Sequence, residues 1–495
     1  MYWLELIVLT LYTGALSFIF LYSISQLNLV YLFRKAKRKG MIPDEPEIPE
    51  NYDHPMVTVQ LPVYNELYVV ERLIDAVAAF DWPKDRFEIQ VLDDSDDETV
   101  QLIANKVAEW QQKGLDIQQV RRPERKGFKA GALQYGIEIS KGEYFAIFDA
   151  DFVPDKDFLQ KTIPHFEKDE KIGVVQSRWG HLNKEYSMLT KLQAFGLNTH
   201  FFVEQNGRSS GKHFLNFNGT AGVWRKSCIL DAGGWKADTL TEDLDLSYRA
   251  QLKGWEIFYV SNTVAPAELP AAMGAIKSQQ YRWTKGAAET SRKLLPKVLK
   301  AKLPLATKFH ATFHLLNSAI FICIVLTAFL SVPVLFIRNL SSGWQVLLNV
   351  STIFLLGYVF LVIFYWNGFK EEKQSFWKTL KEFVPQMFML LSVFLGLSVH
   401  NAVAVMEGLM GKKTPFVRTP KFNITKKEGS WKGNKYFSRK INPLTMLEGF
   451  LSLYFIGGLG LAFYFNDFAL LPFHILLSLG FLLVFYYTVQ HTRHA

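Results

Sequence analysis

Acidic residues stand directly after apolar runs in the first half of the chain, where they could bind a divalent cation. Asp149 and Asp151 follow the apolar residues 145–148. Residues two positions apart on an extended segment point to the same side, so both carboxylates can reach one ligand. Mg²⁺ and Mn²⁺ accept one or two carboxylates together with phosphate oxygens and water. The pair therefore indicates a divalent-metal site, and a solvated strand end is the alternative.

A basic segment that contains glycine, residues 125–131 with the sequence RKGFKAG, opens onto a predicted helix. Cationic side chains and the amides at a helix start together suit a diphosphate, and an ordinary solvated turn is the alternative. The chain contains neither a G-x-x-x-x-G-K-[ST] motif nor a G-x-G-x-x-G motif. A P-loop ATPase and a dinucleotide-dependent oxidoreductase are therefore disfavoured.

Three other motifs could carry chemistry, although each has a structural explanation on its own. The pair DD at residues 93–94 ends an apolar run and could cap the next helix. The motif TED at residues 241–243 precedes a helical run, residues 246–253, and could also act as a cap. The motif QQYRW at residues 279–283 lies in a basic, partly amphipathic segment, residues 271–295, whose composition predicts an interfacial helix.

The elements that must position these motifs alternate between strands and helices. Helices are predicted up to residue 79 and over residues 98–113, and the strands are predicted at residues 57–61, 87–92, 117–120 and 144–148. This βαβ rhythm predicts an α/β fold with a mostly parallel sheet and helices on both faces. In such sheets ligands bind beyond the carboxyl ends of the strands, where the acidic motifs fall.

The composition indicates a membrane protein. Of the 495 residues, 49% are hydrophobic and only 20% are charged, which is too apolar for a disordered chain. The two cysteines exclude a disulfide-rich scaffold and an all-cysteine zinc site. Spanning a bilayer needs roughly 20 mainly apolar residues. Five uncharged stretches meet this need, at residues 6–32, 309–337, 346–366, 449–466 and 468–492.

The first stretch is expected to be an uncleaved anchor, because it is longer than a signal peptide's apolar core and no A-x-A site follows it. A sixth stretch, residues 384–405, is interrupted by His400 and Asn401. The residues that follow it, 406–441, have a net charge of +8, nearly the whole +9 of the chain. The positive-inside tendency keeps this loop in the cytoplasm, so the sixth stretch is expected to be interfacial or re-entrant. Attraction to lipid headgroups alone is the alternative explanation of the basic loop.

These expectations divide the chain into three parts. Residues 1–33 form a transmembrane helix, residues 34–300 form a cytosolic domain with interfacial helices, and residues 301–495 form a transmembrane region. The predicted features of the third part are spans at about 309–337, 346–366, 449–466 and 468–490, the interfacial or re-entrant segment 384–405, and a basic cytosolic loop at 406–445.

Taken together, the motifs resemble the family 2 glycosyltransferases. The motifs that occur in the family's order are LPVYNE at residues 61–66, DD at 93–94, DAD at 149–151, TED at 241–243 and Q-x-x-R-W at 279–283. The finer resemblance is to cellulose synthase-like proteins, especially plant-type synthases of mannan, glucomannan and xyloglucan backbones. It rests on FNGTAGVWR at residues 217–225 and on PFVRTPK at residues 415–421. The second segment resembles the gating loop F-x-V-T-x-K, with Arg418 in place of the valine.

The resemblance implies a GT-A fold, which is a Rossmann-like mixed sheet, and a role for each matched residue. Asp243 is expected to be the catalytic base, with Glu242 as the next candidate. The other implied roles are donor binding by Pro62, Tyr64, Glu66, Asp94, Lys129, Asp149, Gln279 and Arg282, acceptor binding by Trp283, Asn218 and Gly219, metal binding by Asp149 and Asp151, and a gating loop with Phe416, Arg418, Thr419 and Lys421.

The resemblance also implies an inverting, processive β-glycosyltransferase in the plasma (inner) membrane, with its catalytic domain in the cytoplasm. It would transfer glucose or mannose from a UDP- or GDP-sugar to a growing β-glycan and export the product. The expected cofactor is a divalent cation, Mg²⁺ or Mn²⁺, and the expected partners are a glycan or lipid acceptor and the lipid bilayer, without nucleic acid. The alternatives are a ceramide or diacylglycerol glucosyltransferase, which shares the motifs, and an inactive membrane transporter or scaffold. The motifs distinguish neither the donor sugar nor the oligomeric state.

Overall fold

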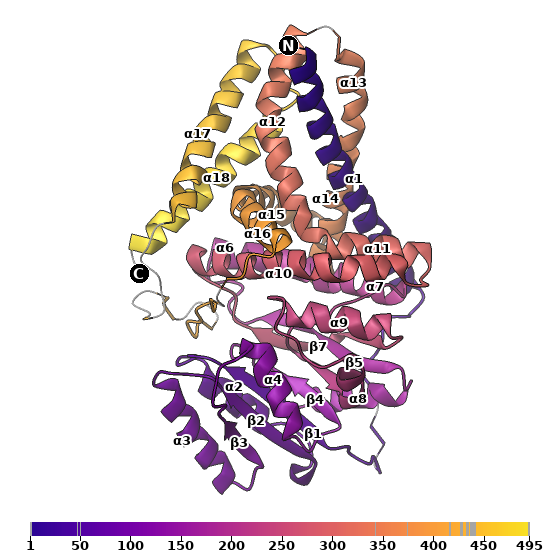
Figure 1. Ribbon diagram of the computed structural model, residues 1–495, viewed down its shortest axis with the longest axis vertical. Helices are drawn as coiled ribbons and strands as arrows, with labels where there is room; N and C mark the ends of the chain where they lie inside the picture. Colours follow the sequence, from indigo (N-terminus) through magenta and orange to yellow (C-terminus); the bar gives the residue numbers. More distant parts are fainter. Residues whose placement is uncertain are drawn as a thin grey trace.

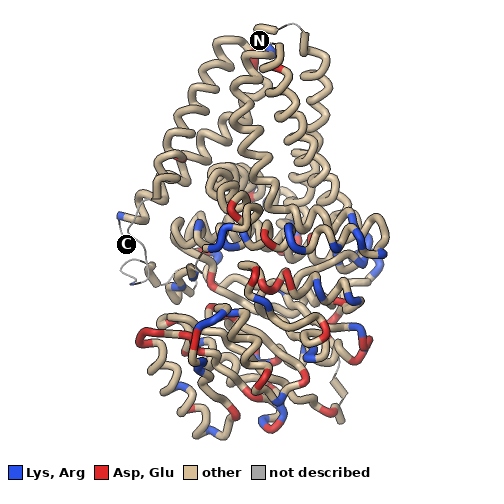
Figure 2. Tube along the Cα trace, viewed as in Figure 1, with Lys and Arg blue, Asp and Glu red and all other residues tan. Residues whose placement is uncertain are grey.

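An α/β domain lies at one end of the molecule and a helical bundle at the other (Figure 1). The computed structural model describes residues 2–46, 48–49, 51–341, 343–373, 375–414, 417–425, 429–431, 435 and 442–493. Between the two parts lies a layer of helices that includes α6 (Met188–Thr199), α7 (Asn206–Ser210), α10 (Met273–Lys300) and α11 (Leu305–Leu315) (Figure 1). Charged residues are frequent in the α/β domain and in this layer, and the far half of the bundle contains few of them (Figure 2).

The sheet has seven strands in the order β3-β2-β1-β4-β6-β5-β7. The first four strands of the chain are parallel to one another, as β5 and β7 are, and β6 is antiparallel to both β4 and β5. The strands are β1 (Val57–Val63), β2 (Phe87–Asp93), β3 (Ile117–Val120), β4 (Tyr144–Ile147), β5 (Ile172–His181), β6 (Gly222–Arg225) and β7 (Glu256–Ala267). The prediction of a mixed, mainly parallel sheet of the GT-A type is therefore confirmed.

The central strands are buried on both faces because helices cover both sides of the sheet. On one face Val59 and Val91 pack into a hydrophobic core with α2. On the other face Gln60 Nε2 donates to Gln90 Oε1 at 3.1 Å, which joins two neighbouring strands through their side chains. The helices of the domain are α2 (Val70–Ala78), α3 (Thr99–Gln112), α4 (Phe128–Glu138), α5 (Phe158–Thr162), α6 (Met188–Thr199), the π-helix η3 (His200–Gln205), α7 (Asn206–Ser210), α8 (Lys226–Asp231) and α9 (Glu242–Leu252).

Five helices of the described chain are long and apolar enough to cross a membrane. They are α1 (Tyr2–Arg38), Asn317–Leu340 with α12 (Ile320–Leu340), Gln345–Glu372 with α13 (Gln345–Val350) and α14 (Leu355–Phe369), α17 (Pro443–Tyr464) and α18 (Leu471–Arg493). A sixth candidate is the pair α15 (Phe376–Gly396) and α16 (Ser398–Met410), which is bent by 48°. The bend lies just before His400 and Asn401, where the apolar run is interrupted.

The predicted span at residues 309–337 begins too early. Residues 305–315 form a separate helix, α11 (Leu305–Leu315), which ends before the span. Its histidines explain the difference, because their rings find polar partners on α1 and α9. His310 Nε2 lies 2.9 Å from Asn28 Oδ1, and His314 Nδ1 lies 2.8 Å from Tyr248 Oη. The division of the chain at residues 33 and 300, and the side of the membrane that each part faces, stay predictions.

Candidate active site

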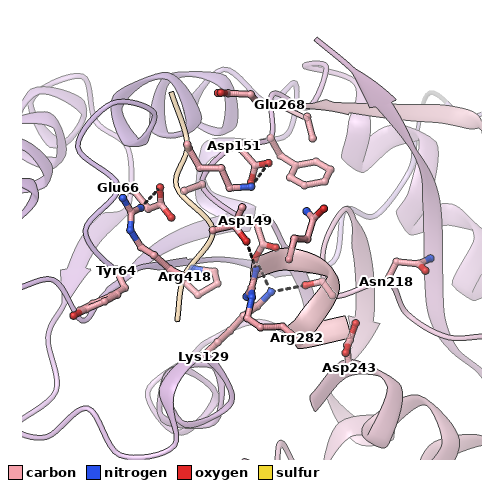
Figure 3. Close-up of a pocket in the computed structure, with 18 of the residues that line it drawn as sticks. Tyr64, Glu66, Lys129, Asp149, Asp151, Asn218, Asp243, Glu268, Arg282 and Arg418 are labelled. Atoms are coloured by element: carbon pink, nitrogen blue, oxygen red, sulfur yellow. Dashed lines mark hydrogen bonds and ion pairs between the residues drawn. The ribbon is translucent and has the colours of Figure 1, made fainter. Parts of the chain in front are cut away.

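One pocket lies at the carboxyl ends of the parallel strands and is lined by residues of the helix α10 (Met273–Lys300), which lies between the sheet and the bundle (Figure 1). Figure 3 shows this pocket. The pocket gathers every predicted site residue that the structure describes, although their positions in the chain span more than 350 residues. These residues are Pro62, Tyr64, Glu66, Asp94, Lys129, Asp149, Asp151, Asn218, Gly219, Glu242, Asp243, Gln279, Arg282, Trp283, Arg418, Thr419 and Lys421. Phe416, predicted for the gating loop, lies outside the described residues.

The acidic pair Asp149 and Asp151 stands in a turn and not on an extended segment. The strand β4 ends at Ile147, and the Phe152 amide donates to Asp149 O at 3.0 Å to close the turn. The two carboxylates therefore do not share a side by strand alternation, as their spacing suggested. Asp149 Oδ1 lies 2.5 Å from Lys129 Nζ, and Asp151 Oδ2 lies 2.6 Å from Lys421 Nζ (Figure 3). Both carboxylates still line the same pocket.

This pair of carboxylates fits a divalent cation that arrives with a phosphorylated substrate. Within the described part of the chain, no group of three or more His, Cys, Asp or Glu side chains is placed to hold a metal ion. Mg²⁺ needs only one or two carboxylates when phosphate oxygens and water complete its coordination, and Mn²⁺ favours the same oxygen ligands. Oxygen ligands from Asp149 and Asp151, each now balanced by a lysine, match that requirement.

Positive charge surrounds the neighbouring part of the pocket. Gly127, with φ 75°, makes the left-handed turn that starts α4 and brings Lys129 to the pocket. Arg122 Nε and Nη2 donate to the two oxygens of the Asp94 carboxylate in a bidentate ion pair, and both side chains are buried. The Arg125 guanidinium stacks on the Tyr64 ring at 3.3 Å from its centre. The segment 125–131 therefore supplies cations beside the acidic turn, as a diphosphate requires.

Asp243 and Glu242 begin α9, and neither Thr241 nor another side chain caps this helix in the described structure. Burial, and then the charge of Glu242, raise the pKa of Asp243 to about 7. Burial also raises the pKa of Glu242, which Lys129 opposes. Gly219, with φ 81°, lies against the Asp243 carboxylate, since a Cβ there would stand 3.1 Å from Asp243 Oδ2. A half-buried carboxyl group with a pKa near neutrality is suited to exchange a proton.

The helix α10 presents Gln279, Arg282 and Trp283 to the pocket. Arg282 Nη2 donates to Thr419 Oγ1 at 2.7 Å, and burial lowers the pKa of this guanidinium against the opposing charge of the acidic residues. Another side chain of the same helix, Lys277, forms a buried ion pair with Glu448 of α17 at 2.6 Å. One helix thus joins the pocket to the bundle.

The segment 417–424 crosses the mouth of the pocket. Arg418 Nη1 lies 2.7 Å from Glu66 Oε2, so the residue that departs from the gating-loop pattern pairs with the LPVYNE motif (Figure 3). Burial raises the pKa of Glu66 to about 7, although Arg418 opposes this shift. The Phe422 amide donates to Glu268 Oε1 at 2.9 Å. Sequence reasoning missed Glu268, a buried carboxylate in the pocket wall whose only signal is its place directly after β7.

Other residues of the pocket wall belong to none of the sequence motifs. They include Trp179 and His181 at the end of β5, Leu197 of α6 and Pro270. Burial lowers the pKa of His181 to about 4, so this ring is neutral near pH 7. The only sequence signal is position, because β5 and β7 end at the edge of the sheet where the acidic motifs lie.

Comparisons with known proteins agree with this geometry. The family model "Glycosyl transferase family 2" matches residues 58–229, and "Glycosyl transferase family group 2" matches residues 144–395. Glucomannan 4-beta-mannosyltransferase 1 of Cyamopsis tetragonoloba is 43% identical over 294 residues, which cover 57% of this chain and 56% of that protein. Glucomannan 4-beta-mannosyltransferase 1 of Oryza sativa subsp. japonica is 35% identical over 430 residues, which cover 82% of this chain and 77% of that protein. The chain thus spans little more than half of the first relative and most of the second.

A solved structure shares the fold. The mannosyltransferase of Pyrobaculum calidifontis in complex with GDP-Man and Mn²⁺ superposes with a TM-score of 0.52 at 18% identity, covering 80% of this chain and all of that one. The family models, the extent of the match to the Oryza protein and the shared fold lead to one conclusion. The chain belongs to glycosyl transferase family 2, in its cellulose synthase-like group.

Proposed function

We propose that the chain is a membrane-embedded, inverting and processive β-mannosyltransferase that uses GDP-mannose to extend a β-1,4-linked glycan. The observation that carries this proposal is the pocket, which brings a cationic wall, an acidic turn and a near-neutral carboxyl group to one place. The names of the relatives support mannose as the hexose and a glycan as the acceptor. GDP-Man and Mn²⁺ in the structure with the shared fold support the donor and the cation.

The proposed reaction is a single displacement. An acceptor hydroxyl oxygen attacks the anomeric carbon, the bond from that carbon to the diphosphate oxygen breaks, and an α-linked donor becomes a β-glycoside. Asp243 takes the proton of the attacking hydroxyl, a contribution of about 10²–10⁴-fold in rate. Its raised pKa favours this role, because a base works best when its pKa lies near the working pH.

Other residues of the pocket bind and orient the two substrates in this proposal. Lys129 and Arg282 face the charge of the leaving nucleoside diphosphate, and Asp94 lies near the nucleotide base. A divalent cation held by Asp149 and Asp151 would neutralise further charge on the diphosphate. Trp283 offers an apolar ring to the acceptor sugar. The remaining lining residues predicted for donor binding are Pro62, Tyr64, Glu66 and Gln279.

Export of the product is part of the same proposal. The Lys277–Glu448 ion pair ties α10, the helix between the pocket and the bundle, to the candidate span α17, so a growing glycan would leave the pocket beside the candidate spans. The proposed orientation places the α/β domain in the cytoplasm at the plasma membrane, with the segment 417–424 as a gating loop. It predicts that the turn after α12 faces outward and that residue 430 faces inward.

Cysteine labelling tests this orientation. Gly343 and Ser430 are both exposed, and of the native cysteines only Cys323 needs replacement, since Cys228 is buried. In intact cells a Gly343→Cys variant should react with a membrane-impermeant maleimide, whereas Ser430→Cys should react only after permeabilisation. Labelling of Ser430→Cys in intact cells would contradict the cytoplasmic position proposed for the basic loop.

The activity itself is tested with purified protein in nanodiscs supplied with GDP-mannose and Mn²⁺. The expected product is a polymer that an endo-β-1,4-mannanase degrades, and UDP-glucose in place of GDP-mannose should support much less incorporation. A product that carries one sugar on a lipid would contradict the polymerase and identify the chain as a glycolipid synthase.

A further inference from the structure

One part of the pocket wall is neutral and is held by side chains that lie outside the pocket. His181 and Asn218 are its polar members, and Figure 3 shows Asn218 set apart from the Lys129–Asp149 pair. Both are supported by residues 197–200, here named the support turn, at the junction of α6 and the π-helix η3. A π-helix is rare in proteins and occurs frequently at functional sites.

Two contacts connect the support turn to the polar members of the wall. Asn198 Oδ1 lies 3.0 Å from His181 Nε2, and His200 Nε2 lies 3.3 Å from Asn218 Oδ1. Leu197, the first residue of the support turn, lines the pocket directly. A single turn of helix therefore contributes one wall residue and fixes two others.

His200 is itself oriented by a charged residue. Its Nδ1 lies 2.9 Å from Glu204 Oε2, and Glu204 Oε1 accepts from Arg208 Nε at 3.0 Å and from Nη2 at 2.8 Å. Arg208 is only 1% exposed, so this ion pair is inside the protein. With Nδ1 donating to the carboxylate, the His200 Nε2 atom accepts from Gln205 Nε2 at 3.1 Å, and the same Gln205 amide lies 3.3 Å from Asn218 Oδ1. An orienting carboxylate thus fixes the ring, and His200 acts on Asn218 through Gln205.

These contacts decide which groups face a ligand. Asn218 Oδ1 accepts from two amide groups, Asn216 Nδ2 at 2.9 Å and Gln205 Nε2 at 3.3 Å. Among the residues that the structure describes, the Asn218 Nδ2 group has only a 3.5 Å contact with Asn216 O, so it is left to donate to a ligand. His181 is neutral and donates from Nε2 to Asn198, so its Nδ1 is left as an acceptor.

We propose that the support turn positions the acceptor sugar, with Asn198 and His200 as positioning residues that act through His181 and Asn218. One donor and one acceptor on the same wall suit the hydroxyl groups of a terminal hexose, which both donate and accept. The donor nucleotide lies at the charged side of the pocket and makes no use of this wall. This inference rests on the proposed function, because it assumes a glycan acceptor.

Initial-rate kinetics with GDP-mannose and β-1,4-mannohexaose test the inference. His200→Ala and Asn198→Ala should each raise the KM for mannohexaose by about tenfold, and the KM for GDP-mannose should stay within about twofold of the parent. His200→Gln should restore most of the mannohexaose affinity, because its side-chain amide oxygen can accept from Gln205 Nε2 in place of the ring Nε2. Asn206→Ala is the matched control, since the Asn206 side chain bonds only to Phe202 O in the described structure.

A double variant separates positioning from general damage to the fold. His200→Ala combined with Asn218→Ala should raise the mannohexaose KM no more than Asn218→Ala alone, because both changes remove one contact. Additive effects, or an unchanged mannohexaose KM in His200→Ala, would overturn the inference. Equal rises in both KM values, with a lowered melting temperature, would also overturn it in favour of a structural role. If the parent chain transfers no mannose to mannohexaose, the proposed function fails, and this inference fails with it.

Discussion

The acidic side chains at the two ends of the pocket differ in whether a cationic side chain is paired with them. At the donor end each acidic side chain has a cationic partner, as Asp149 has Lys129, Asp151 has Lys421 and Glu66 has Arg418. At the other end Asp243 lies half-buried beside Glu242, and no ion pair reaches Asp243 within the described residues. We therefore expect the donor end, here named the paired end, to bind substrate and the Asp243 end, here named the unpaired end, to take part in the reaction. The acidic charges of the paired end are balanced by cations before a ligand binds. At the unpaired end the ionised form of Asp243 is destabilised by burial and by the charge of Glu242.

The comparison also explains why two neighbouring acids of one helix behave differently. Asp245 is fully buried, whereas Asp243 is half-buried, but Asp245 lies 2.7 Å from Arg249 Nε and 2.6 Å from Lys293 Nζ. Asp245 therefore ties α9 to α10 as an ordinary buried ion pair. Asp243, two residues earlier, has the raised pKa. Unfavourable charge of this kind is typical of functional sites and reduces stability.

The largest effect is expected from removal of the divalent cation, which tests the paired end. Excess chelator should abolish transfer, because Asp149 and Asp151 are expected to bind the donor diphosphate through the metal. Added Mn²⁺ or Mg²⁺ should restore the activity, which is measured as incorporation of mannose from GDP-mannose. Full activity in excess chelator would remove the metal role from this carboxylate pair.

The next effect tests the unpaired end. Asp243→Asn keeps the size of the side chain but cannot take a proton, so kcat should fall by about 10²-fold or more with GDP-mannose binding nearly intact. A helix cap would tolerate this change, because Asn caps about as well as Asp. Turnover within a few-fold of the parent in a folded protein would move the base to another residue, with Glu242 next.

A smaller effect is expected from pH, and it also distinguishes the two ends. Asp243 acts as a base only when ionised, and its pKa is about 7, with Glu242 and Lys129 as the charged groups that face it. Below pH 7 the value of kcat/KM should therefore fall about tenfold per pH unit, and above pH 7 it should level off. The profile is measured with GDP-mannose at fixed ionic strength. A flat profile between pH 5.5 and about 8 would show that no group of this kind limits the reaction.

The smallest effect is on stability, and its sign follows from the same pKa. A carboxyl group whose pKa is raised in the folded state favours folding at low pH. This contribution is fully present below the unfolded value of about 4 and is lost progressively as the pH rises through about 7. Asp243→Asn should therefore raise the melting temperature at pH 8 by about 1–3 °C, and the gain should be smaller at pH 5.5 and vanish only at about pH 4. Asp245→Asn is the control, and it should lower the melting temperature because it breaks an ion pair. A loss of stability in Asp243→Asn at pH 8 would mean that its charge is well compensated.

Much of the fold and the composition of the site could be predicted from local patterns. Four strands were predicted close to their observed places, including β3 at residues 117–120, because alternation of apolar and turn residues is a local property. The predicted site residues could be expected to meet, since the carboxyl ends of parallel strands lie at one edge of a sheet. The order of the motifs was enough to identify the family.

Pairings between distant residues were decided only by the tertiary structure. Lys421 pairs with Asp151 and Arg418 with Glu66 across more than 250 positions, and no local pattern specifies such partners. The pKa of Asp243 depends on burial under other elements, and the support turn acts through residues that no motif marks. Two local arguments failed for the same reason. Asp149 and Asp151 stand in a turn set by contacts beyond the strand, and the apolar residues 309–315 left the expected span because their histidines bond to α1 and α9. The sequence determined which groups were available, and packing determined which of them became partners, because hydrogen bonds and ion pairs depend on distances that only the folded chain sets.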